Sequence, residues 1–266
     1  MTWEDAVLWL RQQPDQKALV RDCFYDDPLL ASAERYRQST EWQAVRKLLP
    51  SPPGRALDIG AGRGISSYAL CSEGWDTTAL EPDSSDIVGA GAIRSLAGEA
   101  GLNIAIVEGP GENLPFVNQT FDLVYCRQAL HHAHDLFRLC KEMERVLKRG
   151  GMLIATREHV ISSKEDLQSF LDNHPLQRLY GGEHAYLQSE YIAALLQAGF
   201  ELLHVLNPLA SDINLFPDTQ NSYKERLAAR MNWPWPRLIP DVFLTLLGHN
   251  LRTPGRMYSF IGRKPT

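Results

Sequence analysis

The stretch Ala56-Leu57-Asp58-Ile59-Gly60-Ala61-Gly62-Arg63-Gly64 decides the fold of this 266-residue chain. A strand pattern runs into a glycine-rich turn, and a helical pattern follows over residues 64–73. Glycine lets the backbone approach a ligand closely, and free N–H groups at the start of a helix can bind an anionic group. A dinucleotide fingerprint would need glycine where Ile65 stands, and no Gly-Lys-Ser/Thr follows as in a P-loop. The turn is therefore a ligand-binding candidate of another type.

Strand-like and helix-like segments alternate from this turn onward. Strands are expected at residues 56–59, 77–80, 104–107, 123–126 and 152–156, with helices at 64–73, 85–100 and 135–148. This alternation predicts an α/β fold with a parallel sheet covered by helices on both faces. Beyond it we expect helices at 163–172 and 189–198, a strand at 200–206, about 45 irregular residues, and a last strand at 257–261.

The chain before the turn carries helical spacing over residues 3–22 and 32–49. The breaker cluster Ser51-Pro52-Pro53-Gly54 separates these helices from the first strand. We therefore predict N-terminal helices over residues 1–50 that form a cap or lid. The ligand-binding core follows over residues 51–160. Residues 161–266 are expected to complete the same domain and to add insertions on the acceptor side.

Composition narrows the function. Apolar residues make up 44% and charged residues 22%, which excludes a disordered or fibrous chain, and the net charge of −5 disfavours a nucleic-acid partner. Residues 226–266 hold seven basic residues and one acid, so this tail could position an anionic acceptor. The four cysteines form no zinc or redox motif, and the sequence shows neither a signal peptide nor an apolar run long enough to span a membrane. A cytoplasmic location is expected.

Four further blocks accompany the glycine turn. Glu81 ends the second strand, where its carboxylate can accept hydrogen bonds from both hydroxyls of a ribose. The remaining blocks are residues 108–116, 121–132 and 142–154, which follow the third strand, span the fourth and lead into the fifth. Over roughly residues 55–158 this ordered set resembles the class I S-adenosylmethionine-dependent methyltransferases, in the branch that contains the ubiquinone and menaquinone methyltransferases.

The resemblance implies a Rossmann-like methyltransferase fold. This fold has a mostly parallel seven-stranded sheet, an N-terminal helical cap and an insertion before the last strand. It also implies S-adenosyl-L-methionine as the cofactor and S-adenosyl-L-homocysteine as the product. The implied cofactor-binding residues are Asp58, Gly60, Ala61, Gly62 and Gly64 at the methionine end, Glu81 at the ribose, Pro82, Gly111 and Glu112 around the adenine, and Arg127 beside the methionine moiety.

One position departs from the family pattern. Relatives usually carry Gly-Asp-Ala where this chain reads Gly109-Pro110-Gly111, so the aspartate that accepts from the adenine amino group is missing. Glu112 is the candidate substitute; otherwise the affinity for the cofactor is reduced.

Histidines supply the candidate catalytic groups. A hydroxyl acceptor must lose its proton, which calls for a base with a pKa near neutral. The candidates are His131, His132, His159 and His184, with His132 and His159 first because both are expected at strand ends. The same histidines could instead cap a loop or line the pocket wall. His132-Ala133-His134 does not continue as the H-x-H-x-D-H pattern of binuclear hydrolases, so no metal is expected.

Residues outside the core give weaker signals. Tyr36 and Arg37 are candidate lid residues, with ordinary packing as the alternative. The cluster Trp233-Pro234-Trp235-Pro236 could form part of an acceptor pocket or a dimer contact, or simply belong to the core.

The sequence therefore predicts a methyltransferase that acts on a small-molecule acceptor, with oxygen as the acceptor atom. One alternative is carbon methylation of a quinone-like or lipid intermediate. Another is a non-catalytic S-adenosylmethionine-binding or scaffold protein, which the Pro110 departure favours. The chain is expected to be a monomer or a homodimer.

Overall fold

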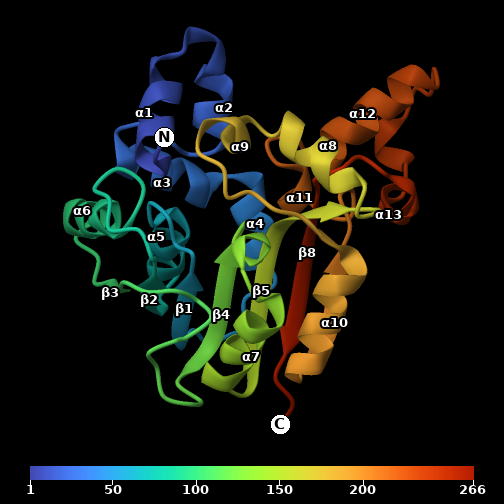
Figure 1. Ribbon diagram of the computed structural model, residues 1–266. Helices are drawn as coiled ribbons and strands as arrows, with labels where there is room; N and C mark the ends of the chain where they lie inside the picture. Colours follow the sequence, from blue (N-terminus) through green and yellow to red (C-terminus); the bar gives the residue numbers. More distant parts are fainter.

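The strand that precedes the glycine turn, β1, lies inside an eight-stranded sheet (Figure 1). The computed structural model describes residues 1–266. The strands are β1 (Arg55–Ile59), β2 (Asp76–Leu80), β3 (Ala105–Val107), β4 (Phe121–Arg127), β5 (Leu147–Ile161), β6 (Tyr186–Leu187), β7 (Glu201–Leu206) and β8 (Arg256–Arg263). Their order is β3-β2-β1-β4-β5-β8-β7, with β6 pairing beside β5 off this path. Only β8 runs antiparallel to its neighbours, β5 and β7. The predicted Rossmann-like, mostly parallel sheet is confirmed.

Helices cover both faces of this sheet (Figure 1). They are α1 (Trp3–Gln12), α2 (Lys17–Asp22), α3 (Leu29–Gln38), α4 (Thr40–Arg46), α5 (Ile65–Ser72), α6 (Ala90–Ala100), α7 (Leu136–Val146), α8 (Asp166–Asn173), α9 (Pro175–Leu179), α10 (Gln188–Ala198), α11 (Asp212–Leu215), α12 (Gln220–Arg230) and α13 (Asp241–Asn250). Three short 3-10 helices also occur, η1 (Pro14–Gln16), η2 (Leu130–His132) and η3 (Pro236–Leu238).

Two large apolar clusters form the core, one on each face of the sheet. The first joins α7 and α10 to the sheet, and the second joins α3, α4, α5 and α11. Both faces are buried, so β1 and β2 are buried at every position after their first residue. Such continuous burial is typical of parallel strands that lie between two helical layers.

Several predicted element boundaries are wrong, for local reasons. The helix expected over 3–22 breaks at Pro14, which begins η1, and the one expected over 32–49 breaks at Ser39, whose side chain caps α4. Helix α6 begins at residue 90 rather than 85, because the Ser85 hydroxyl accepts from the backbone N–H groups of Ile87 and Val88 and holds that segment as a turn.

The prediction of an irregular stretch before the last strand is also wrong. This segment contains α11, α12, η3 and α13. It presents apolar side chains to solvent, among them Trp233 and Trp235 in the loop between α12 and η3, which are 47% and 60% exposed. Exposed apolar residues weaken the periodic pattern on which a helix prediction depends. No helix of the protein has both the length and the apolar character needed to cross a membrane.

Candidate functional site

A cavity of about 660 Å³ opens at the carboxyl ends of the parallel strands. Its wall includes the residues that follow β1, β2 and β4, which is where open α/β sheets bind ligands. Its volume lies in the range of sites for small molecules and cofactors. Most predicted cofactor residues line it, namely Gly60, Ala61, Gly62, Glu81, Pro82, Gly111, Glu112 and Arg127. The assignment of roles to them stays a prediction.

The glycine turn lies against this cavity in a left-handed conformation that favours glycine. Gly60, Gly62 and Gly64 all have positive φ, at 66°, 55° and 82°. A Cβ on Gly60 would lie 2.9 Å from that of Ala129, so glycine is required there. Gly64 caps α5 and packs against Ile93 rather than against the cavity.

Three N–H groups of the turn already donate within the protein, so they are not free to bind an anionic group. Gly60 and Ala61 donate to the Leu80 carbonyl at 2.9 and 3.2 Å, and Gly62 donates to Glu81 Oε2 at 2.7 Å. The turn therefore offers a ligand its close backbone surface and carbonyl oxygens.

Asp58 supports the turn from behind. Its side chain is fully buried, does not line the cavity, and accepts from the hydroxyls of Ser66 and Ser67 at 2.7 and 2.6 Å. Burial raises the pKa of Asp58 to about 6, against these two hydrogen bonds. This geometry suits a residue that orients the glycine turn rather than one that contacts the ligand.

Glu81 is the central carboxylate of this half of the cavity. It is only 3% exposed, and its Oε1 accepts from the backbone N–H of Asp83 at 3.0 Å. Burial raises the pKa of Glu81 to about 7, although the N–H groups of Asp83 and Gly62 favour the charged form. A carboxylate fixed by two backbone donors keeps lone pairs available for ribose hydroxyls.

The adenine side combines small residues with one acid. A Cβ on Gly111 would come within 2.7 Å of Leu139 Cδ1, so a bulkier residue would require the Leu139 side chain to move. Glu112 lines the cavity and accepts from the backbone N–H of His134 at 3.0 Å through one oxygen. Its second carboxylate oxygen is the available acceptor near the missing aspartate, where Pro110 stands.

Arg127 lines the cavity but is already paired. Its guanidinium binds Glu41 through Nε at 2.6 Å and Nη2 at 3.0 Å, and it lies over the ring of Tyr36. Burial acts to lower the pKa of Arg127, but the charge of the fully buried Glu41 outweighs it and keeps the guanidinium protonated. Glu41 gave no signal in the sequence, because α4 shows only an ordinary helical pattern.

Three of the four predicted catalytic histidines meet at the other end of the cavity. His131, His132 and His159 line it, whereas His184 packs against Tyr186 outside it. The rings of His131 and His159 lie 4.7 Å apart and are buried, at 1% and 4% exposed.

A bulge in β5 brings these groups together. The strand continues through residues 157–161, past its predicted end, and Arg157 has a φ of 60° where the pairing with β8 shifts register. Such a bulge re-aims the side chains that follow it. Glu158 accepts from the backbone N–H groups of Ala129, Leu130 and His131 and from His131 Nδ1 at 2.8 Å.

The histidines differ in protonation. Burial acts to lower the pKa of His131, but contacts with Glu158 and Glu183 outweigh it and raise the pKa to about 9. Burial and the His131 cation lower the pKa of His132 and hold that of His159 well below its usual value. His132 Nδ1 contacts the Gly182 carbonyl and His159 Nδ1 the Gly255 carbonyl, each at 3.0 Å. A carbonyl only accepts, so both rings carry their proton on Nδ1 and present Nε2 as an acceptor.

Glu183, the residue before the candidate base His184, belongs to the same group although the sequence analysis did not single it out. It is 8% exposed, and its Oε2 lies 3.6 Å from His131 Nε2. One ligand atom each from His131, His159 and Glu183 lie within 4.8 Å of one another, although the three residues come from separate segments. Local motifs such as His132-Ala133-His134 give no hint of this grouping. His174 lies beside them, with its Nδ1 buried and without a partner.

The roof of the cavity comes from segments on both sides of the core in sequence. Trp3, Cys23, Phe24 and Tyr25 line it from the N-terminal segment, and Tyr180 lines it from the loop after α9. Trp3 packs against Tyr25 and Tyr180, with ring centroids 6.4 and 6.5 Å away. For the candidate lid residues the packing role matches the structure: Tyr36 is fully buried in the core, and Arg37 pairs with Glu34.

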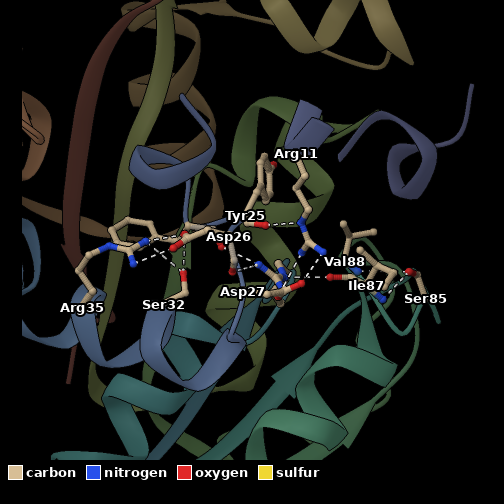
Figure 2. A network of polar contacts seen from close by, with 11 residues as sticks. Arg11, Tyr25, Asp26, Asp27, Ser32, Arg35, Ser85, Ile87 and Val88 are labelled. Atoms are coloured by element: carbon tan, nitrogen blue, oxygen red, sulfur yellow. Dashed lines mark hydrogen bonds and ion pairs between the residues drawn. The ribbon is translucent and has the colours of Figure 1, made fainter. Parts of the chain in front are cut away.

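The N-terminal cap is fastened to the glycine turn by a polar network (Figure 2). Arg63, between two glycines of the turn, donates to the carbonyls of Phe24, Asp26 and Ile87 and to Asp27. Arg11 also reaches Asp27, and Arg35 binds Asp26 from another helix (Figure 2). The cap and the turn therefore form one connected unit.

Neither the basic tail nor the tryptophan cluster contributes to this cavity. No basic residue after Glu225 lines it, and neither do Trp233 and Trp235. Three tail cations pair with acids instead, Arg226 with Asp218, Arg263 with Glu201 and Lys264 with Glu144. The cavity's own guanidinium groups, Arg63 and Arg127, are both paired with carboxylates. The expectation of an anionic acceptor held by the tail finds no support here.

Comparisons with known proteins agree with this geometry. Residues 57–155 match the family described as a methyltransferase domain. The uncharacterized methyltransferase YcgJ of Bacillus subtilis is 30% identical over 174 residues, which are 60% of this chain and 64% of that protein. The ubiquinone biosynthesis O-methyltransferase of Azorhizobium caulinodans is 29% identical over 188 residues, 67% of this chain and 73% of that protein.

A solved structure is similar over most of the chain. The crystal structure of YcgJ covers 85% of this chain and 98% of its own, with a TM-score of 0.57 and 19% identity. The sequence match spans somewhat less than two thirds of YcgJ, whereas the structural match spans nearly all of it.

Proposed function

We propose that this chain, a class I S-adenosylmethionine-dependent methyltransferase, transfers the cofactor's methyl group to a hydroxyl oxygen of a small-molecule acceptor. One observation carries the proposal. A single cavity has the glycine turn and Glu81 on one wall and His131, His132 and His159 on another.

The first wall fits the cofactor. Gly60, Ala61 and Gly62 offer a close backbone surface for the methionine end, and Glu81 offers fixed acceptor oxygens for the ribose. Pro82 and Gly111 leave room for a flat adenine, with Glu112 as acceptor for its amino group. Bound S-adenosylmethionine would supply an electrophilic methyl carbon, which an oxygen lone pair attacks while the carbon–sulfur bond breaks onto sulfur.

The second wall fits a hydroxyl acceptor. An alkoxide or phenolate forms only if a base accepts the hydroxyl proton, and the base must itself be unprotonated at neutral pH. His132 and His159 meet this condition, because their pKa values are lowered and their Nε2 atoms are acceptors. His131 does not, because its pKa is about 9. We assign the base role to His132, whose ring is the more accessible of the two. The O-methyltransferase relative from Azorhizobium caulinodans supports oxygen over carbon.

Calorimetry with S-adenosylmethionine and S-adenosylhomocysteine tests the cofactor half. Saturable binding of both is expected, with loss of binding in Glu81→Ala. If the wild-type protein bound neither compound, the remaining alternative would be a non-catalytic scaffold protein, which the Pro110 departure favours. A screen of hydroxyl-bearing and quinone-like acceptors for S-adenosylhomocysteine release then follows, and transfer only to carbon would refute the oxygen assignment.

His132→Gln tests the base. The expected result is a fall in turnover of about 10²- to 10⁴-fold with cofactor affinity unchanged, because general-base catalysis contributes a factor of that size. The control is His204→Gln, which removes an exposed histidine on β7 far from the cavity wall. Unchanged turnover in His132→Gln would remove His132 from the mechanism.

A further inference from the structure

His131, His159 and Glu183 form a cluster whose arrangement is that of metal ligands. We propose that these three side chains bind a divalent transition-metal ion, with zinc the best fit, and that its open coordination positions face the acceptor end of the cavity. All three residues are buried, and all three line the cavity. Their role in holding the acceptor rests on the proposed methyl transfer, whereas the metal site itself does not.

The spacing of the ligand atoms supports the site. The three atoms lie within 4.8 Å of one another, and His131 Nε2 is already 3.6 Å from Glu183 Oε2. In a tetrahedral zinc site with bonds of 2.0–2.1 Å, neighbouring ligand atoms lie about 3.3 Å apart. A side-chain movement of roughly 1 Å would therefore close the triad around an ion.

The ring atoms that do not face the proposed ion are held as metal-bound histidines require. His131 Nδ1 bonds to Glu158, which three backbone N–H groups fix in place, and His159 Nδ1 bonds to the Gly255 carbonyl. Each ring therefore turns Nε2 toward the cluster. A histidine that donates from its second nitrogen to a carboxylate or a carbonyl is typical of metal sites, because that bond orients the ring and fixes its tautomer.

The cluster is incompletely satisfied without an ion, which is an independent observation. The 3.6 Å separation of His131 Nε2 from Glu183 exceeds a hydrogen bond, and His174 Nδ1 is buried without a partner 3.8 Å from Glu183 Oε1. Buried polar atoms normally find partners. An ion bound by Glu183 and the two rings would give His131 Nε2 the partner that it lacks at hydrogen-bond distance.

The chemical types of the three ligands favour particular metal ions and particular acceptors. Two imidazoles and one carboxylate suit zinc and its transition-metal neighbours, whereas magnesium and calcium prefer oxygen ligands. Three protein ligands leave one position in a tetrahedral ion and two in a five-coordinate one. These positions suit a hydroxyl oxygen with a second oxygen beside it. Coordination would lower the pKa of a hydroxyl bound there.

Cobalt(II) provides a direct probe, because it replaces zinc and absorbs visible light when bound. The full-length protein is treated with a chelator, dialysed and titrated with CoCl₂. The expected result is one saturable site with a visible spectrum, displaced by ZnCl₂. His159→Gln and Glu183→Gln should weaken the affinity at least about tenfold, and His204→Gln should not. Circular dichroism of each variant checks that it folds.

Two results would overturn the site. One is the absence of a saturable visible spectrum in the wild-type protein, which needs no variant to fold. The other is equal cobalt affinity in Glu183→Gln and wild type, which would show surface binding only. Calorimetry with S-adenosylhomocysteine distinguishes a failure of the metal site from a failure of the proposed function. Cobalt binding without S-adenosylhomocysteine binding would support the metal site and refute the proposed function. S-adenosylhomocysteine binding without cobalt binding would refute the metal site and leave the proposed function unaffected.

Discussion

Glu81 shows how one buried side chain can control an affinity. Its carboxylate is held by the N–H groups of Gly62 and Asp83, yet burial raises its pKa to about 7. Ribose hydroxyls donate to the ionised form, whereas the protonated form loses an acceptor position. The charge needed for binding is therefore only partly present at neutral pH.

This predicts a pH-dependent cofactor affinity. The group is an acid whose pKa is raised in the folded state, so the ionised form accumulates as the pH rises through about 7. Affinity for S-adenosylhomocysteine should be greatest above pH 8 and should fall by up to about tenfold for each unit below pH 7. Calorimetry from pH 5.5 to 8.5 measures this. Glu81→Gln, which cannot ionise, should bind weakly with no such dependence; a similar slope in that variant would assign the effect to another group.

Among single residues, the sequence singled out those cavity residues that lie in a strong local pattern. Gly60, Gly62 and Glu81 follow strands that alternate with helices, so their meeting at one sheet edge could be predicted. His174 lies between α8 and α9, and Glu183 lies on the loop after α9. Glu41 lies on a helix 86 positions before Arg127. Their contacts depend on tertiary packing, which no local pattern encodes.

Among the elements, α4 is joined to the sheet by a buried charge cluster. Glu41 on α4 binds Arg127 on β4 and lies 3.7 Å from Arg157 on β5. Taking one partner from such a cluster leaves a buried charge without compensation, which is more costly than losing an exposed pair.

Glu41→Gln should therefore lower the free energy of unfolding by about 3–5 kcal/mol, as measured by urea denaturation. The matched control is Glu201→Gln, which breaks a pair with Arg263 that is about half exposed and should cost less than about 1 kcal/mol. Equal losses in the two variants would contradict the assigned role of the cluster.

Element boundaries separate what a sequence predicts well from what it predicts poorly. The type and order of the core strands were predictable, because each is a short apolar run between turn signals. The extension of β5 through a bulge at Arg157 was not, since one residue with positive φ re-aims Glu158 and His159 without changing composition. That bulge is what places both residues beside His131.

At the scale of the whole molecule, the cavity is closed by segments from both sides of the core. Trp3 belongs to the first helix and Tyr180 to the loop after α9, and their rings lie 6.5 Å apart. In Figure 1, α1, α2, α8 and α9 gather at the same end of the sheet. A ligand in the cavity would therefore lie beneath side chains that are distant in sequence.

Trp3→Ala should weaken S-adenosylhomocysteine binding by about tenfold, because an aromatic contact of this kind contributes about 0.5–1.5 kcal/mol beyond its buried area. Calorimetry measures the affinity, and a melting curve checks the fold. Trp235→Ala, which removes an exposed indole outside the cavity, should bind like wild type. An unchanged affinity in Trp3→Ala would show that the roof makes no contact with the ligand.

Arg63 gives the glycine turn an uncommon property. A segment with three glycines has more conformational freedom to lose than any other of its length, and ligand binding would normally have to restrict it. Here the guanidinium that projects from its middle is already tied to Phe24, Asp26, Asp27 and Ile87. Folding has thus restricted the turn before any ligand arrives, so the entropy lost on binding is smaller. Asp27 does not line the cavity, yet through Arg63 it helps to set the affinity of a site that it does not contact.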